Sequence, residues 1–171
     1  YTDNPKKFID NLYMYKLGES YDFDLNGFAS PYIPSPENRS EWSGTTLGSM
    51  AIGYSVSVTP LHTLTFYNAI ANKGKMMKPY LVEDIEENGI VKEKKGPSVL
   101  NGSICSKATA DSITAGLMKI AKEGTASKMK GAPLTFAGKT GTSHIVFSAG
   151  KGKKASYKPG PDQTRKYQAS I

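Results

Sequence analysis

The sequence of 171 residues has little cysteine, little histidine and no long run of apolar residues. Its single cysteine, Cys105, excludes a disulfide within the chain and a cysteine-based metal cluster. The two histidines, His62 and His144, are scattered, so neither a metal site nor a cofactor is expected. No apolar run approaches the roughly 18 residues that a membrane-spanning helix needs. We therefore expect a globular domain in which Cys105 and His62 are packing residues.

The excess of positive charge is concentrated near the C-terminal end. The chain has 22 Lys and Arg against 15 Asp and Glu, which gives a net charge of +7. Residues 148–171 hold six of the basic residues and one acid, which leaves 16 basic and 14 acidic residues elsewhere. Residues 148–166 are rich in Gly, Lys and Pro and poor in aromatic residues, so they predict a flexible basic loop rather than a nucleic-acid-binding surface.

Capping signals predict three helices, each preceded by a capping residue and followed by a glycine: 5–17 with Asn4 and Gly18, 60–73 with Thr59 and Gly74, and 107–123 with Ser106 and Gly124. Apolar residues surround most of the second helix, which predicts that it is largely buried. Residues 18–50 carry no regular pattern and predict a long irregular loop, with Trp42 anchoring it.

The remaining signals indicate strands. Asn88-Gly89 separates residues 81–87 from 90–95 and predicts a solvated hairpin with a type I′ turn. A strand is expected over 134–147, and a returning strand over 167–171. The chain begins at Tyr1, without an initiator methionine or a targeting segment, so we expect it to be a piece of a longer protein.

Residues 137–143 read A-G-K-T-G-T-S and allow more than one interpretation. A phosphate-binding loop does not fit, because Pro133 stands where that motif needs glycine. A glycine-rich kink in an edge strand, with polar residues facing water, is the structural interpretation. The functional interpretation is a binding strand, in which Gly141 leaves room for a ligand and Lys139 supplies positive charge for its carboxylate.

Three further segments accompany this motif in a fixed order: a glycine-rich turn, Thr-Pro and helix at 51–74, P-Y-L-V at 79–82, and E-G-T-A at 123–126. Together the four segments resemble the C-terminal half of the transpeptidase domain of class B, division-type penicillin-binding proteins. The likeness covers most of residues 5–147. Ser55 and His62 depart from it, since glycine and glutamine are expected at these two positions.

The resemblance implies an α/β (α+β) fold, namely a partial penicillin-binding transpeptidase or serine β-lactamase-like fold. Helices would surround an antiparallel sheet, with the N-terminal half and the last strands missing. Residues 1–171 would form the C-terminal part of one transpeptidase domain. Its partners would include the N-terminal half of that same domain.

For the whole protein, the resemblance implies a D,D-transpeptidase that crosslinks peptidoglycan through an acyl-serine intermediate. The substrate would be a stem peptide ending in D-Ala-D-Ala, and β-lactam antibiotics would mimic it. No cofactor or metal would be needed. The domain would lie on the outer, periplasmic side of the bacterial cytoplasmic membrane, held by an anchor outside this chain. Other cell-wall synthesis or division proteins would be partners, and nucleic acid would not.

Motif position assigns roles through the same resemblance. Lys139 would supply positive potential beside the nucleophile, and the hydroxyls of Thr140 and Thr142 would hold the substrate carboxylate. Gly141 would let the substrate backbone lie close to the strand. The backbone N–H of Thr142 would be an oxyanion donor. His144 is a further candidate for lining the substrate site, and an outward-facing strand residue is the alternative.

The sequence offers no convincing nucleophile. Ser127 and Ser148 are each followed by a lysine three positions later, but neither lies in a segment that predicts the buried helix this chemistry needs. No Ser-x-Asn occurs. The catalytic serine is therefore expected outside this chain, and the isolated chain is expected to be inactive. The alternatives are a non-catalytic module that holds cell-wall peptides and a basic nucleic-acid adaptor.

Overall fold

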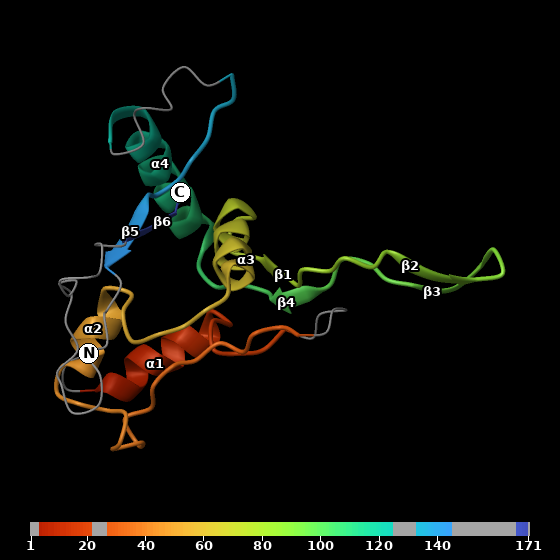
Figure 1. Cartoon of the computed structure of the whole chain (residues 1–171). Coiled ribbons are helices and arrows are strands. Elements are labelled where there is room, and N and C mark those ends of the chain that lie inside the picture. The colour runs from red at the N-terminus through yellow and green to blue at the C-terminus, as the bar shows by residue number, and fades with distance from the viewer. Residues whose placement is uncertain (1–3, 22–26, 125–132, 145–166, 171) are drawn as a thin grey trace, which may run out of the picture. The chain divides into compact units, whose positions relative to one another are not determined.

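The structure is a computed structural model, and it describes residues 4–21, 27–124, 133–144 and 167–170. The chain divides into two compact units, Tyr1–Asp111 and Ser112–Ile171. The elements, in chain order, are α1 (Pro5–Met14), α2 (Thr46–Ala51), α3 (Pro60–Ala71), β1 (Met76–Met77), β2 (Asp84–Glu87), β3 (Ile90–Lys94), β4 (Val99–Asn101), α4 (Lys107–Glu123), β5 (Gly141–His144) and β6 (Tyr167–Ser170). The mixture of helices and antiparallel strand pairs in Figure 1 confirms the predicted fold class.

The three predicted helices form with their predicted N-terminal capping residues, but α1 ends at Met14 and α3 at Ala71, before the predicted ends at residues 17 and 73. The Asn4 side chain accepts a hydrogen bond from the Lys7 N–H, and the Thr59 side chain accepts one from the His62 N–H. The Ser106 hydroxyl accepts one from the N–H of Thr109 at 3.1 Å. Each bond satisfies a backbone donor that the first turn of a helix leaves without a partner.

The core of the first unit lies where the end of α3 meets β1 and the segment before α4. Its buried members are Ala69, Ile70, Met76 and Ile104. Cys105 packs against them as the sequence predicted, but it is half-buried rather than buried. Gly74 makes the turn between α3 and β1 with a φ of +95°. Its carbonyl accepts a hydrogen bond of 2.8 Å from the N–H of Ile104. The glycine therefore connects the two sides of this core.

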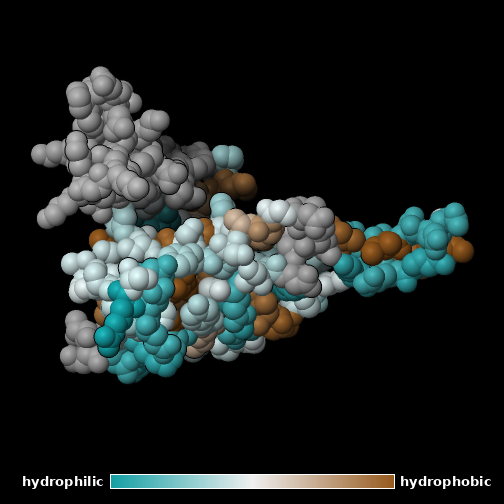
Figure 2. Space-filling model, turned by 60° about the horizontal axis from the view of Figure 1, so that its bottom comes forward, coloured by the Kyte–Doolittle hydropathy of each residue, from teal (hydrophilic) through white to brown (hydrophobic). Residues whose placement is uncertain are grey.

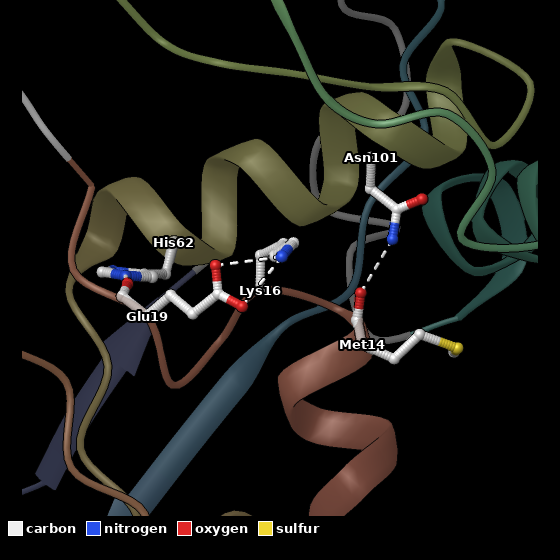
Figure 3. Close-up of polar contacts among 5 residues, drawn as sticks. All are labelled: Met14, Lys16, Glu19, His62 and Asn101. Atoms are coloured by element: carbon white, nitrogen blue, oxygen red, sulfur yellow. Dashed lines mark hydrogen bonds and ion pairs between the residues drawn. The ribbon is translucent and has the colours of Figure 1, made fainter.

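His62 fastens the irregular segment to the start of α3. Its side chain is fully buried, and its ring stacks on Tyr21 with 4.3 Å between ring centroids. Its Nε2 lies 2.8 Å from the carbonyl oxygen of Glu19, and its Nδ1 lies 2.7 Å from the hydroxyl of Thr59 (Figure 3 shows the ring beside Glu19). Because a carbonyl can only accept, Nε2 carries a proton and donates to Glu19, and in the neutral ring Nδ1 then accepts from the Thr59 hydroxyl. The expectation that His62 is a packing residue is confirmed.

A second link of this kind joins α1 to β4. The side-chain amide of Asn101 donates to the carbonyl oxygen of Met14 at 2.9 Å (Figure 3). Met14 is the last residue of α1, so this bond satisfies one of the carbonyls that a helix C-terminus leaves open.

The predicted hairpin forms from β2 and β3. Asn88 and Gly89 have φ values of 53° and 76°, as a type I′ turn requires. Every residue of the two strands is exposed, and Figure 2 shows hydrophobic residues along the hairpin between hydrophilic ones. Asp84 faces Lys94, an opposite-charge pair, whereas the other register pairs place an acid opposite an apolar residue.

Three expectations about secondary structure need correction. The last residues of the predicted irregular segment 18–50 belong to the short helix α2, which begins at Thr46 and which the sequence did not predict. The predicted strand 134–147 is shorter at its start, because β5 begins only at Gly141. The face of α3 that carries Leu64 and Tyr67 is not buried, since these side chains are 56% and 39% exposed within the part of the chain described here.

Some sequence predictions fall on residues whose structure is not described. They include the basic loop 148–166 and the two Ser-x-x-Lys matches at Ser127 and Ser148. The returning strand is confirmed as β6, which pairs with β5. Within the described ranges, every helix is too short or too polar to cross a membrane.

Asp111 gives the first unit a pH-dependent contact. Its carboxylate accepts hydrogen bonds from Lys107 at 2.8 Å and from Lys73, which follows α3 by two residues, at 2.7 Å. These two lysines, Lys107 first, lower the pKa of Asp111 from 3.8 to about 2. Because the pKa of Asp111 is lowered in the folded state, its carboxylate stabilises the fold above about pH 4. This stabilisation is lost as the pH falls through 2.

Asp111→Asn should therefore flatten the dependence of stability on pH in the acid range. We expect the urea midpoint of the wild type to fall more between pH 5 and pH 2 than that of Asp111→Asn. Lys73→Gln should remove part of the same dependence, because it removes one of the two ammonium groups. Equal slopes in the wild type and Asp111→Asn would show that the carboxylate does not sense its lysine neighbours.

Candidate functional site

The candidate site lies at the start of β5 in the second unit. β5 and β6 form an antiparallel pair in which Gly141 faces Ser170 and Thr142 faces Ala169. Within the described residues this sheet has two strands, so β5 has a strand partner on one side only. A strand edge without a partner is the element to which an extended peptide can add by backbone hydrogen bonds.

Lys139 and Thr140 come immediately before this strand. The Lys139 side chain is exposed, and its Nζ donates a hydrogen bond of 2.7 Å to the carbonyl oxygen of Thr140. Thr140 and Gly141 are half-buried. The ammonium group is therefore held beside the first residue of the strand while it stays accessible to water. An ammonium group in this place can also pair with a carboxylate that approaches the strand.

Gly138 fixes the segment to α4. Its N–H donates to the carbonyl oxygen of Leu117 at 3.4 Å, a long hydrogen bond within the second unit. Sequence reasoning did not identify this contact, because a glycine followed by Lys-Thr gives no sign of its partner 21 positions earlier. The bond connects the candidate segment to α4, a helix of 17 residues.

The sequence-predicted site residues follow one another along this single segment. Lys139, Thr140 and Gly141 are described with their surroundings, and the backbones of Thr142 and His144 belong to β5. The side chains of Thr142 and His144 lie outside what the structure describes. The ammonium group of Lys139, the hydroxyl of Thr140 and the edge of β5 together suit an extended ligand that ends in a carboxylate. Among the described residues, no group of His, Cys, Asp and Glu side chains could hold a metal ion.

Comparison with known proteins gives consistent matches. The sequence model of the family described as the penicillin-binding protein transpeptidase domain matches residues 4–160. The chain is 26% identical over 153 residues to penicillin-binding protein PbpB of Mycolicibacterium smegmatis, covering 85% of this chain and 23% of that protein. It is also 30% identical over 127 residues to penicillin-binding protein 2A of Bacillus subtilis. This match covers 67% of this chain and 18% of that protein.

A solved structure agrees with these sequence matches. Penicillin-binding protein 3 of Mycobacterium tuberculosis, crystallised with ampicillin, superposes with a TM-score of 0.70 at 26% identity, over 84% of this chain and 32% of that one. The chain therefore spans less than a quarter of the two curated relatives and about a third of this solved one.

Proposed function

Since this chain belongs to the family of penicillin-binding protein transpeptidase domains, we propose that it is the part of a peptidoglycan D,D-transpeptidase that binds the substrate's terminal carboxylate. In the proposed reaction, a serine hydroxyl attacks the carbonyl carbon of the penultimate D-alanine, and the terminal D-alanine leaves with a proton. The amine of a neighbouring stem peptide then attacks the acyl-serine, forms the crosslink and releases the serine.

The observation that supports this role is the exposed Lys139 ammonium held beside a strand, β5, that has a partner on one side only among the described residues. Lys139 would attract the carboxylate and raise the positive potential at the nucleophile. The hydroxyls of Thr140 and Thr142 would hold the carboxylate by hydrogen bonds, and Gly141 would let the peptide backbone lie against β5. The N–H of Thr142 would stabilise the oxyanion of the tetrahedral intermediate, where one such donor is typically worth about 10² to 10³ in rate.

The nucleophilic serine is proposed to lie outside residues 1–171, so the isolated chain would bind but not turn over substrate. The whole protein would act in cell division, on the outer side of the bacterial cytoplasmic membrane, with an anchor outside this chain. Its partners would be the rest of its own domain, the D-Ala-D-Ala stem peptide and other cell-wall synthesis proteins. β-Lactams would acylate the same serine.

Intact-protein mass spectrometry after incubation with benzylpenicillin tests this proposal. The protein that carries the whole domain should gain the mass of one penicilloyl group, and the chain of residues 1–171 should gain none. Peptide mapping should place the adduct on a serine outside these residues. An adduct on Ser127 or Ser148 would show that the assignment of the nucleophile is wrong. Absence of any adduct on the whole protein would favour a non-catalytic peptide-holding module.

A further inference from the structure

The sequence contains three Asn-Gly pairs, at residues 26–27, 88–89 and 101–102. An asparagine side chain can lose its amide when the backbone nitrogen of the next residue attacks the side-chain carbonyl carbon. Glycine in the next position favours this attack, because it has no Cβ to obstruct it. The pairs at 88–89 and 101–102 lie within the described ranges, whereas Asn26 lies outside them. The two described pairs can therefore be compared.

The carboxamide of Asn101 is held at both ends. Its NH₂ group donates to the carbonyl oxygen of Met14 at 2.9 Å, and its oxygen accepts a hydrogen bond of 3.0 Å from the N–H of Ser103. Asn101 also pairs with Met76 between β4 and β1. Attack by the Gly102 nitrogen requires the carboxamide to leave both hydrogen bonds. The fold of the first unit therefore protects Asn101.

Asn88 lies in a different environment. Asn88 and Gly89 are exposed and form the turn at the end of β2 and β3 (Figure 1). Within the described ranges, no hydrogen bond holds the carboxamide of Asn88. Every residue of β2 and β3 is exposed, and the sheet that they form has two strands among the described residues. A two-stranded hairpin of this kind is marginally stable in water, so it can open while the core stays folded.

Opening of the hairpin matters because the intact turn restrains the attack. Asn88 has a φ of 53° in the turn, and the strands on both sides pair Glu87 with Ile90. The five-membered ring that the attack forms requires a different rotation of the backbone at Asn88. The rate at Asn88 should therefore depend on local opening of the hairpin, whereas the rate at Asn101 should depend on unfolding of the first unit.

We propose that Asn88 is a site of spontaneous deamidation. The Gly89 nitrogen, after giving its proton to a base in the solvent, bonds to Cγ of Asn88. The bond from Cγ to the side-chain nitrogen breaks, and that nitrogen leaves as ammonia with a proton from the solvent. One water molecule then opens the resulting succinimide at either of its two carbonyl carbons, which gives aspartate or isoaspartate.

Both products change the hairpin. Each adds one negative charge next to Glu86 and Glu87. Isoaspartate also adds a methylene group to the backbone, so the turn no longer fits the pairing of Glu87 with Ile90. The inference is independent of the proposed function, because it rests on the hairpin alone.

Peptide mapping of the protein that carries the whole domain tests the proposal. The protein is incubated in mildly alkaline buffer with and without denaturing urea, and mass spectrometry follows the replacement of amide by carboxyl at each Asn-Gly pair. In urea, Asn88 and Asn101 should deamidate at similar rates. Without urea, Asn101 should be more than about tenfold slower than Asn88, because its hydrogen bonds must break. Equal rates at the two positions without urea would overturn the proposal, as would the absence of any product at Asn88.

Gly89→Ala separates the chemistry of attack from the opening of the turn. The methyl group weakens the turn, because position 89 has a φ of +76°, but it also obstructs the attacking nitrogen. Deamidation of Asn88 without urea should therefore slow by about tenfold, although the hairpin opens more often. An unchanged or faster rate would show that attack by the Gly89 nitrogen does not limit the reaction, and that part of the proposal would be wrong.

Trypsin tests the effect of isoaspartate on the hairpin. Protein with isoaspartate at position 88 should be cleaved faster after Lys92 and Lys94, which lie in β3. Its urea midpoint should hardly change, because the buried core of the first unit contains no residue of the hairpin. Asn88→Asp is the matched control: it adds the same charge without the methylene group and suits a type I′ turn. If both forms are cleaved at the same rate, isoaspartate does not open the hairpin.

Discussion

Replacing Gly74 with alanine is expected to be the most damaging small substitution in the first unit. A Cβ at this position would lie 2.2 Å from the carbonyl oxygen of Cys105 and 3.2 Å from its carbonyl carbon. These are backbone atoms, so no side-chain rotation can relieve the clash. The φ of +95° adds its own cost, because residues with a Cβ rarely adopt it.

The backbone shift would also reach the core. Separating residue 74 from Cys105 would strain the hydrogen bond from the N–H of Ile104 to the carbonyl of Gly74, and Ile104 packs with Met76. We expect a loss of about 3 kcal/mol or more, which is a large share of the roughly 5 to 15 kcal/mol that keep a domain folded.

Urea unfolding followed by circular dichroism measures this loss, and Gly89→Ala is the matched control. Gly89 also has a positive φ, of +76°, but a Cβ there would meet no atom within 4 Å. Gly89→Ala should therefore show only the conformational cost, about 1 kcal/mol. If the two variants lose the same stability, the close approach to Cys105 has no energetic effect.

Replacing Lys139 with alanine should lower the rate of acylation by benzylpenicillin about 10²-fold or more in the protein that carries the whole domain. The proposed reason is electrostatic. Removing the ammonium group takes away the positive charge beside the substrate carboxylate and the nucleophile. Stability should hardly change, because Lys139 is exposed and its hydrogen bond is to the carbonyl of the adjacent residue.

Stopped-flow or quench measurements with a fluorescent penicillin give the acylation rate constant, and Lys119→Ala is the control. Lys119 is an exposed lysine of α4, so its removal makes the same change in net charge. The acylation rate constant of Lys119→Ala should lie within twofold of the wild-type value. If the acylation rate constant of Lys139→Ala is also within twofold of the wild-type value, Lys139 does not take part in the site.

Local signals predicted the helices and the hairpin well. Asn4, Thr59 and Ser106 cap helices because their side chains accept hydrogen bonds from backbone N–H groups only three residues away. Asn88-Gly89 makes its turn for a similar reason, since the required φ values depend on these two residues alone. Such features are readable from sequence because no distant residue decides them.

Features that depend on distant partners could not be predicted in the same way. Apolar residues around α3 predicted that this helix is largely buried, but burial depends on which other segments are present to cover each face. The start of β5 at Gly141 depends on its pairing with Ser170, 29 positions later. The chemistry of residues 139–142 was predicted from motif resemblance, and the structure adds the exposure of Lys139 and its place beside the strand.

The central claim is that Thr140 and Thr142, beside Lys139, hold the carboxylate of the substrate. The most direct measurement compares acylation of the whole protein by benzylpenicillin and by its methyl ester, which lacks that carboxylate. The wild type should prefer the free acid by about 10²-fold or more, because a site built for a charged group rejects an analogue without it. The Thr140→Val, Thr142→Val double variant should lose most of this preference, and Thr135→Val, an exposed threonine before the motif, should retain it. A double variant that keeps the full preference would contradict the account.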